Sequence, residues 1–140
     1  MNQSIKDAII RAVAQEPFVQ TLGMRLTALE KGFSAVEMTY DPLRMDNLFG
    51  RAHGGAIFAL IDEAFETVGQ TDGTVAVAMN VNVNYVASPE NGTRLRAEAR
   101  EVSQTKRTAN YDIRVTDGEG RLIATCQALA YRTGKPLPFL

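Results

Sequence analysis

The hydrophobic positions of the first 40 residues change from a helical to a strand period. Those of residues 1–16 recur every three or four positions and predict an N-terminal helix, with Ser4 as its cap and Pro17 as its end. From residue 24 to residue 40 the period is two, and the chain turns back at Lys31-Gly32, which predicts a β-hairpin. The helical positions are Ile5, Ala8, Ile9, Ala12 and Val13, and the second strand of the hairpin carries Val36, Met38 and Tyr40 on one face.

The rest of the chain predicts one long helix followed by strands. Turn residues predict a loop over residues 41–52, and a helical stripe predicts a helix from Gly54 to Gln70. Because strand-like segments then follow one another, we expect an α+β fold in which one antiparallel sheet wraps the helix. The sheet covers only one side of the helix, so self-association is expected on the other. The stripe is Ile57, Ile61, Phe65 and Val68, widened by Phe58, Leu60 and Ala64, and the strands are 74–86, 93–103, 107–116 and 121–131.

Length and composition narrow the class of protein. A chain of 140 residues fits one domain, with residues 133–140 as an extended tail. A net charge of −1 gives no electrostatic reason to expect nucleic acid or an anionic membrane as partner. The N-terminus lacks the apolar run of a signal peptide or membrane span, so a cytoplasmic location is the default expectation.

His53-Gly54-Gly55 lies at the predicted start of the long helix. The first amides of a helix have no partner within it and point outward at its positive end. Glycine lets a substrate approach this backbone closely, so the motif can form an oxyanion hole for a carbonyl under attack. The alternative is that two glycines simply begin a tightly packed helix.

Asp62 lies beside the apolar stripe of the same helix, at 140° from Ile57 when each residue turns the helix by about 100°. Partial desolvation there would raise the pKa of its carboxyl group toward that of a useful base. Glu66 and Glu63 are expected to point further from the stripe. The alternative is that Asp62 is an ordinary solvated residue on the helix surface.

Gly54 and Asp62 are too far apart to act together on one helix. Eight residues span about 12 Å, whereas a base must lie within about 3 Å of its target. Two antiparallel copies of the helix would bring Asp62 of one chain to Gly54 of the other. The sequence therefore predicts a dimer with shared active sites, if both residues are catalytic.

These residues resemble a known family. The motif that runs from Asn47 through His53-Gly54-Gly55 to Asp62 is similar to that of PaaI-like hotdog-fold acyl-CoA thioesterases. The resemblance implies a central helix wrapped by five or six antiparallel strands, and activity on acyl-CoA without a cofactor. It also implies that Gly54 polarises the thioester carbonyl and that Asp62 of the partner acts as nucleophile or general base. Asn47 would position water or substrate, and His53 would support the carbonyl or Asn47. Further matching segments are 82–85, Ala97, 111–117, Gly120 and 130–132.

One position departs from the family pattern. Relatives often carry Ser or Thr on the strand after the helix to orient the water, and Asn80 stands where that hydroxyl is expected. Its amide can donate and accept, so it could substitute. Asn82 and Asn84 alternate with it onto one face, and for these two a polar sheet face is at least as good an explanation. Other expected pocket residues are Gly55, Phe58, Phe65, Met79 and Tyr85.

Phosphate groups of coenzyme A could bind a basic turn at Lys106-Arg107-Thr108, or Arg51, although both also fit solvated surface positions. No metal site is expected, because His53 is the only histidine and Cys126, the only cysteine, lies in the pattern of a buried strand face.

Two other functions compete with hydrolysis. A hotdog hydratase or dehydratase would need a histidine paired with an acid among different motifs. A non-catalytic acyl-CoA-binding sensor would not need Asp62 near the thioester. In addition, the resemblance implies that a hotdog protein with a sensor function would carry an added DNA-binding domain. The sequence leaves open the acyl chain preference and the choice between a dimer and a dimer of dimers.

Overall fold

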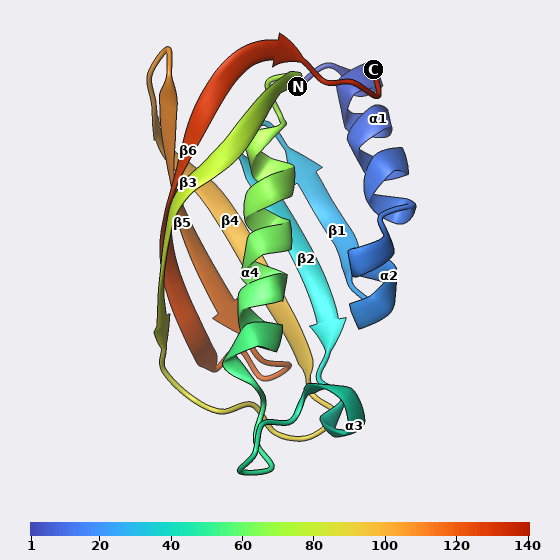
Figure 1. The fold of residues 1–140 in the computed structure, drawn as a ribbon, viewed down its shortest axis with the longest axis vertical. Coiled ribbons are helices and arrows are strands. Elements are labelled where there is room, and N and C mark those ends of the chain that lie inside the picture. The colour runs from blue at the N-terminus through green and yellow to red at the C-terminus, as the bar shows by residue number, and fades with distance from the viewer.

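A computed structural model describes all residues, 1–140. One helix, α4 (Gly54–Gly69), runs along the concave side of a single six-stranded antiparallel sheet (Figure 1). The predicted α+β class and the hotdog arrangement are therefore confirmed. The strands are β1 (Arg25–Glu30), β2 (Phe33–Thr39), β3 (Thr74–Tyr85), β4 (Arg94–Gln104), β5 (Thr108–Thr116) and β6 (Leu122–Pro136), in the spatial order β1-β2-β4-β5-β6-β3.

The N-terminal segment differs in detail from the prediction. It forms α1 (Gln3–Ala14), capped by the Asn2 side chain rather than by Ser4, whose backbone amide donates to Asn2. Pro17 does not simply end this helix, because it begins a second one, α2 (Pro17–Leu22). Proline suits a first helical position, since its missing N–H would have no partner there. These two helices lie beside β1 and α4 (Figure 1).

The core lies between α4 and the sheet. The predicted stripe of Ile57, Ile61, Phe65 and Val68 is buried, but Phe58 is 37% exposed and does not belong to the core. On the sheet side, the predicted face of β2 is buried at Val36, Met38 and Tyr40, and Cys126 of β6 is buried as expected. The Ser34 hydroxyl of β2 donates to the Ala64 carbonyl and fixes the helix on the sheet.

Strand β3 forms one edge of the sheet and is joined to α4 at both of its ends. Near its start, the Gln70 side chain makes two hydrogen bonds to the backbone of Ala76. At its end, the Tyr85 hydroxyl donates to the Gly54 carbonyl at 2.9 Å. The edge is apolar and open, with Val77 and Met79 about half exposed. A long apolar edge is a ready site for another strand.

The loop and tail differ slightly from their predicted forms. The expected loop contains a short helix, α3 (Pro42–Met45), and strand β6 continues as far as Pro136 into the predicted extended tail. No helix is long and apolar enough to span a membrane.

Candidate active site

The segment before α4 folds back on itself. Asp46 and Ala52 form an isolated antiparallel bridge, and the Asn47 amide donates to the Arg51 carbonyl at 2.7 Å. The Asn47 side-chain oxygen accepts hydrogen bonds from the amides of Phe49 and Arg51. The side chain of Asn47 therefore holds the loop together, and only its NH₂ group is left to donate to another molecule.

His53 is the N-cap of α4. Its Nδ1 atom accepts a hydrogen bond from the Gly55 amide at 2.9 Å, and its carbonyl accepts from the Ala56 amide. The Gly54 amide has no acceptor in the chain. Because the neighbouring amides are already bonded, Gly54 supplies the one free N–H at the positive end of the helix.

Tyr85 lies against this free amide. A side-chain carbon added to Gly54 would lie 3.1 Å from the Tyr85 ring and hydroxyl, closer than ordinary contact. Tyr85 was predicted to line the substrate pocket, but in the structure its hydroxyl holds the Gly54 carbonyl. Glycine at position 54 is thus required by its local packing as well as by any ligand.

Asp62 is half-buried, and its carboxylate has no hydrogen-bond or ion-pair partner in the chain. Burial raises the pKa of the Asp62 carboxyl group above its ordinary value of 3.8, as expected at the margin of the stripe. It lines a cavity of about 240 Å³ between α4 and β3, with Phe65, Glu66, Gln70 and Ala78 among its walls. An unpaired, partly desolvated carboxylate beside a cavity has the properties of a general base or nucleophile.

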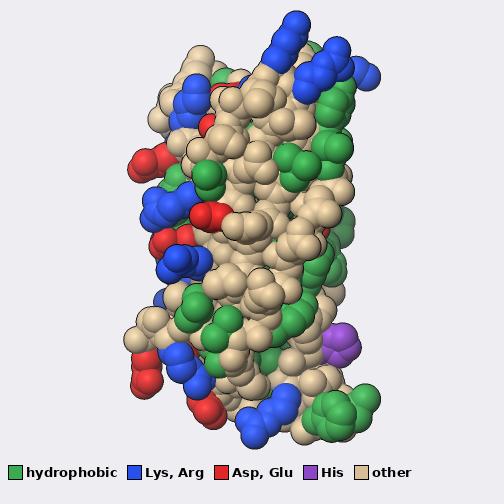
Figure 2. Space-filling view, turned by 90° about the vertical axis from the view of Figure 1, so that its left-hand side faces the viewer, with side chains coloured by type: hydrophobic (Ala, Val, Ile, Leu, Met, Phe, Trp, Pro, Cys, Tyr) green, Lys and Arg blue, Asp and Glu red, His purple; other side chains and the backbone are tan.

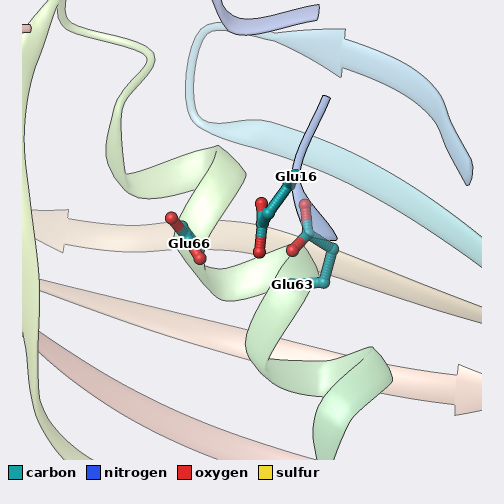
Figure 3. Close-up of side chains that lie close together, drawn as sticks. All are labelled: Glu16, Glu63 and Glu66. Atoms are coloured by element: carbon teal, nitrogen blue, oxygen red, sulfur yellow. The ribbon is translucent and has the colours of Figure 1, made fainter. Parts of the chain in front are cut away.

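Glu63 points away from the apolar stripe of α4, as expected, but it is not exposed to solvent. Its side chain is only 3% exposed, because α1 and α2 cover the face of α4 on which it lies. Its carboxylate meets those of Glu16, at the start of α2, and Glu66, one helical turn further along α4 (Figure 3). Burial, followed by the nearby charges of Glu16, Glu66 and Asp62, raises the pKa of Glu63 to about 8.

The structure does not bring Gly54 and Asp62 together within one chain. Both lie on the same continuous helix, so they remain about 12 Å apart along its axis. Phe58 and Glu66 are exposed on the same side of α4, which the sheet leaves uncovered. A single chain therefore does not bring these two candidate residues to one point.

Asn80 does not lie at this site. Its side chain accepts a hydrogen bond from the Asn82 side chain, and both alternate with Val81 and Val83, which pack against the core. A bulge between Ala78 and Asn80 places Asn80 opposite Leu129 on the outer face. Neutral polar side chains and backbone, drawn tan, make up much of this face (Figure 2), so a polar sheet face describes Asn82 and Asn84 as expected, and Asn80 lies on it too.

The basic residues predicted to hold phosphate groups lie at opposite ends of the molecule. Lys106 and Arg107 form the exposed β4–β5 turn, where Arg107 donates to the Tyr131 hydroxyl and Thr108 bonds to Thr105. This turn lies near the end of α4, since Gln104 bonds to Asp72 just beyond that helix. Arg51 is exposed near the start of α4.

Comparison with known proteins agrees with this geometry. The profile of the thioesterase superfamily matches residues 49–124, which include Gly54 and Asp62. The Escherichia coli acyl-coenzyme A thioesterase PaaI is 30% identical over 115 residues, covering 82% of this chain and 81% of PaaI. The solved structure of E. coli PaaI superposes with a TM-score of 0.90 at 25% identity, with 96% of each chain covered.

Two further proteins point the same way. The proofreading thioesterase EntH of Klebsiella pneumoniae is 29% identical over 123 residues, which cover 86% of this chain and 88% of EntH. The crystal structure of smu.793 from Streptococcus mutans, bound to acetyl CoA, has a TM-score of 0.76 at 29% identity, with 81% and 91% of the two chains covered. The chain therefore belongs to the thioesterase superfamily and is a hotdog-fold thioesterase of the PaaI-like type.

Sequence reasoning missed two features of the site. The bond from Tyr85 to Gly54 joins residues 31 positions apart, and no local pattern indicates it. The meeting of Glu16 with Glu63 depends on how α2 packs against α4. A signal was nevertheless present, because Glu63 lies between Ala59 and Thr67 on one helix face, and both are buried.

Proposed function

We propose that the protein hydrolyses acyl-CoA thioesters to a free acid and coenzyme A. The observation that carries the proposal is the free Gly54 amide at the positive end of α4, next to a loop closed by Asn47. The names of PaaI and EntH, and the acetyl CoA in the smu.793 structure, support the same substrate class.

In the proposed reaction the thioester carbonyl oxygen accepts a hydrogen bond from the Gly54 amide. The negative charge that develops on this oxygen during attack is stabilised by the amide and by the helix dipole. The amides on either side cannot share this task, because His53 already engages those of Gly55 and Ala56. Asn47 can add a donor through its free NH₂ group.

Asp62 of the partner subunit completes the site. Its carboxylate either attacks the carbonyl carbon directly or takes a proton from the attacking water. In both cases the sulfur of coenzyme A leaves after the tetrahedral intermediate collapses. The raised pKa of Asp62 makes it a better base than an exposed aspartate, and the absence of an ion-pair partner leaves it free to react.

The open edge of β3 supports a dimer that would place Asp62 in this way. Antiparallel pairing of two β3 strands would continue the sheet across a two-fold axis and cover Val77 and Met79. It would also lay two α4 helices antiparallel, each covering the exposed Phe58 of the other. Because β3 is bonded to α4 at Gly54 and Gln70, the strand pairing would fix the register of the helices.

The same two-fold axis would bring the basic turn at Lys106-Arg107-Thr108 close to the partner's Gly54. Lys106 and Arg107 lie at the end of α4 opposite Gly54, so each turn would approach the partner's Gly54 site rather than its own. Arg51 would approach that site from its own chain. Phosphate groups of coenzyme A would then be held by basic residues of both subunits.

One assay distinguishes hydrolysis from the alternative of a non-catalytic acyl-CoA sensor. The protein is incubated with short, medium, long and aryl acyl-CoAs, and free thiol is measured against time. Hydrolysis predicts thiol release from at least one substrate class at rates well above the blank. Tight binding of acyl-CoA without thiol release from any substrate would contradict hydrolysis and favour the sensor.

A single turnover in ¹⁸O-labelled water separates the two roles of Asp62. A nucleophilic Asp62 forms a mixed anhydride with the acyl group, and it carries the label on its own carboxylate when water attacks the Asp62 carbon of this anhydride. A general base leaves the label only in the product acid, so label on Asp62 would establish the nucleophilic role.

A further inference from the structure

Three carboxylates meet away from the Gly54 amide. Glu16 approaches from the start of α2, and Glu63 and Glu66 approach from α4 (Figure 3). One oxygen of each lies within 4.8 Å of an oxygen of both others. Glu16 occupies the N-cap position of α2, yet its side chain makes no capping hydrogen bond and turns toward α4 instead.

The burial of Glu63 distinguishes these three carboxylates from an ordinary cluster of acids on the surface. Its side chain is 97% buried, and its Oε1 atom is the only buried side-chain oxygen or nitrogen in the chain without a hydrogen-bond partner. A buried carboxylate without a partner carries a large desolvation cost. A partner for Glu63 would lie between it and the two other carboxylates, because its side chain points toward them.

No basic side chain balances these acids. None of the ion pairs of the chain involves Glu16, Glu63 or Glu66. The one charge outside the group that acts on all three is that of Asp62, which is also negative and raises their pKa values. The group therefore concentrates negative charge that something positive must neutralise.

The geometry and the donor type fit a hard cation. We propose that Glu16, Glu63 and Glu66 form a binding site for a divalent cation of the calcium or manganese class, which joins the start of α2 to the middle of α4. Carboxylate oxygens are the donors that such ions prefer. Oxygens about 2.3–2.6 Å from a calcium ion can lie up to about 5 Å apart, which the observed spacing satisfies.

An ion can reach this site from solvent. Glu16 and Glu66 line a cavity of about 570 Å³ between α1, the C-terminal tail and β3. Thr67 and Gln70 also line it, and water in the cavity can complete the coordination shell that three carboxylates leave open. The buried Glu63 would thus be the inner ligand, and the two others would face the entrance.

The cation site does not depend on the protein being a thioesterase, because none of its three carboxylates belongs to the proposed catalytic residues.

Direct binding tests the site without reference to activity. Protein freed of metal with EDTA and then dialysed is titrated with CaCl₂ by calorimetry, and with MnCl₂ by electron paramagnetic resonance. We expect one ion per chain, a rise of several degrees in Tm on saturation, and competition between the two ions. Absence of binding of either ion up to about 10 mM, above the usual range of protein calcium sites, would overturn the proposal.

Matched variants assign the ligands. Glu63→Gln keeps the shape of the side chain without its charge and should weaken binding at least about tenfold, whereas Glu90→Gln, an exposed acid without an ion pair, should leave it unchanged. Glu16→Gln tests a second ligand at a half-exposed position where folding is not at risk. Equal affinities of wild type and both ligand variants would overturn the proposal. The proposal would also be overturned if the Tm of the protein changed with pH but not with calcium, because the three carboxylates would then hold a proton instead of a cation.

Discussion

The two halves of α4 differ in how completely a single chain satisfies their polar groups. At the start of the helix, His53, Tyr85 and the Asn47 loop use nearly every donor and acceptor, and one amide, that of Gly54, remains free. In the second half, Asp62 and Glu63 carry carboxylate atoms that have no partner.

This difference indicates where a second component must enter. A free amide at a helix start needs only a carbonyl oxygen, which a substrate supplies. Unpaired carboxylates in the second half need positive charge, water or another subunit. The first half of α4 can thus bind a substrate carbonyl without further change. The function of the second half depends on the cation, water or subunit that contacts its carboxylates.

Asp62→Asn should produce the largest effect. The amide has the shape of the carboxylate but can neither attack the carbonyl nor take a proton, so kcat should fall about 10²–10⁴-fold with little change in KM. Thiol release from the best acyl-CoA measures this. A variant with kcat within about threefold of wild type would remove Asp62 from the mechanism while leaving the activity in place.

Gly54→Ala should produce the second-largest loss of activity. The added methyl would press on Tyr85 at 3.1 Å and crowd the approach of the carbonyl, so kcat should fall about 10²-fold. Gly55→Ala is the matched control, because its methyl would meet only the His53 ring, at 3.1 Å, and the Gly55 amide is already bonded. Equal losses in the two variants would argue that helix packing, not the free amide, is affected.

Lys106→Gln should act on substrate affinity. An exposed phosphate contact contributes roughly 0.5–1 kcal/mol, so KM for an acyl-CoA should rise about threefold, with kcat unchanged and the effect reduced at high salt. The matching acyl-pantetheine thioester, which lacks the nucleotide phosphates, should show no change. A similar rise in KM for both substrates would contradict a phosphate contact.

Glu63→Gln should change stability by a few degrees. Folding raises the pKa of Glu63 from 4.5 to about 8, so the folded protein holds this proton more tightly than the unfolded chain. The stability that it contributes is complete below pH 4.5 and is lost as the pH rises through 8. In EDTA, the Tm of the wild type should therefore fall over this range, and that of Glu63→Gln should fall less. Parallel curves in thermal scans would contradict this assignment.

The fold could be predicted because its signals are local. The alternation of Val36, Met38 and Tyr40 and the stripe of α4 each follow from a repeat of two or of 3.6 residues. The start of α4 could be predicted for the same reason, since His53 and Gly54 mark a helix N-terminus by themselves. The N-cap of α1 was assigned two residues too late because Asn2 and Ser4 are both good caps.

The remaining features depend on contacts between distant segments. Asn80 is expected at the water-orienting position only from the family resemblance, whereas its alternation with Asn82 and Asn84 places all three on the outer face of β3. The burial of Glu63 is not predicted, because the sequence pattern does not show that the N-terminal segment packs on its face of α4. The bond from the Tyr85 hydroxyl to the Gly54 carbonyl is also of this kind, because it joins the end of β3 to the start of α4.

Subunit mixing tests the shared site most directly. Asp62→Asn and Gly54→Ala proteins are mixed at equal concentration, unfolded and refolded together, and the heterodimer fraction is measured by native mass spectrometry. If Asp62 serves the partner's Gly54, each heterodimer has one intact site, and activity should recover to about a quarter of the wild-type value. Activity no higher than that of the two separate variants, despite abundant heterodimer, would contradict a site built from two chains.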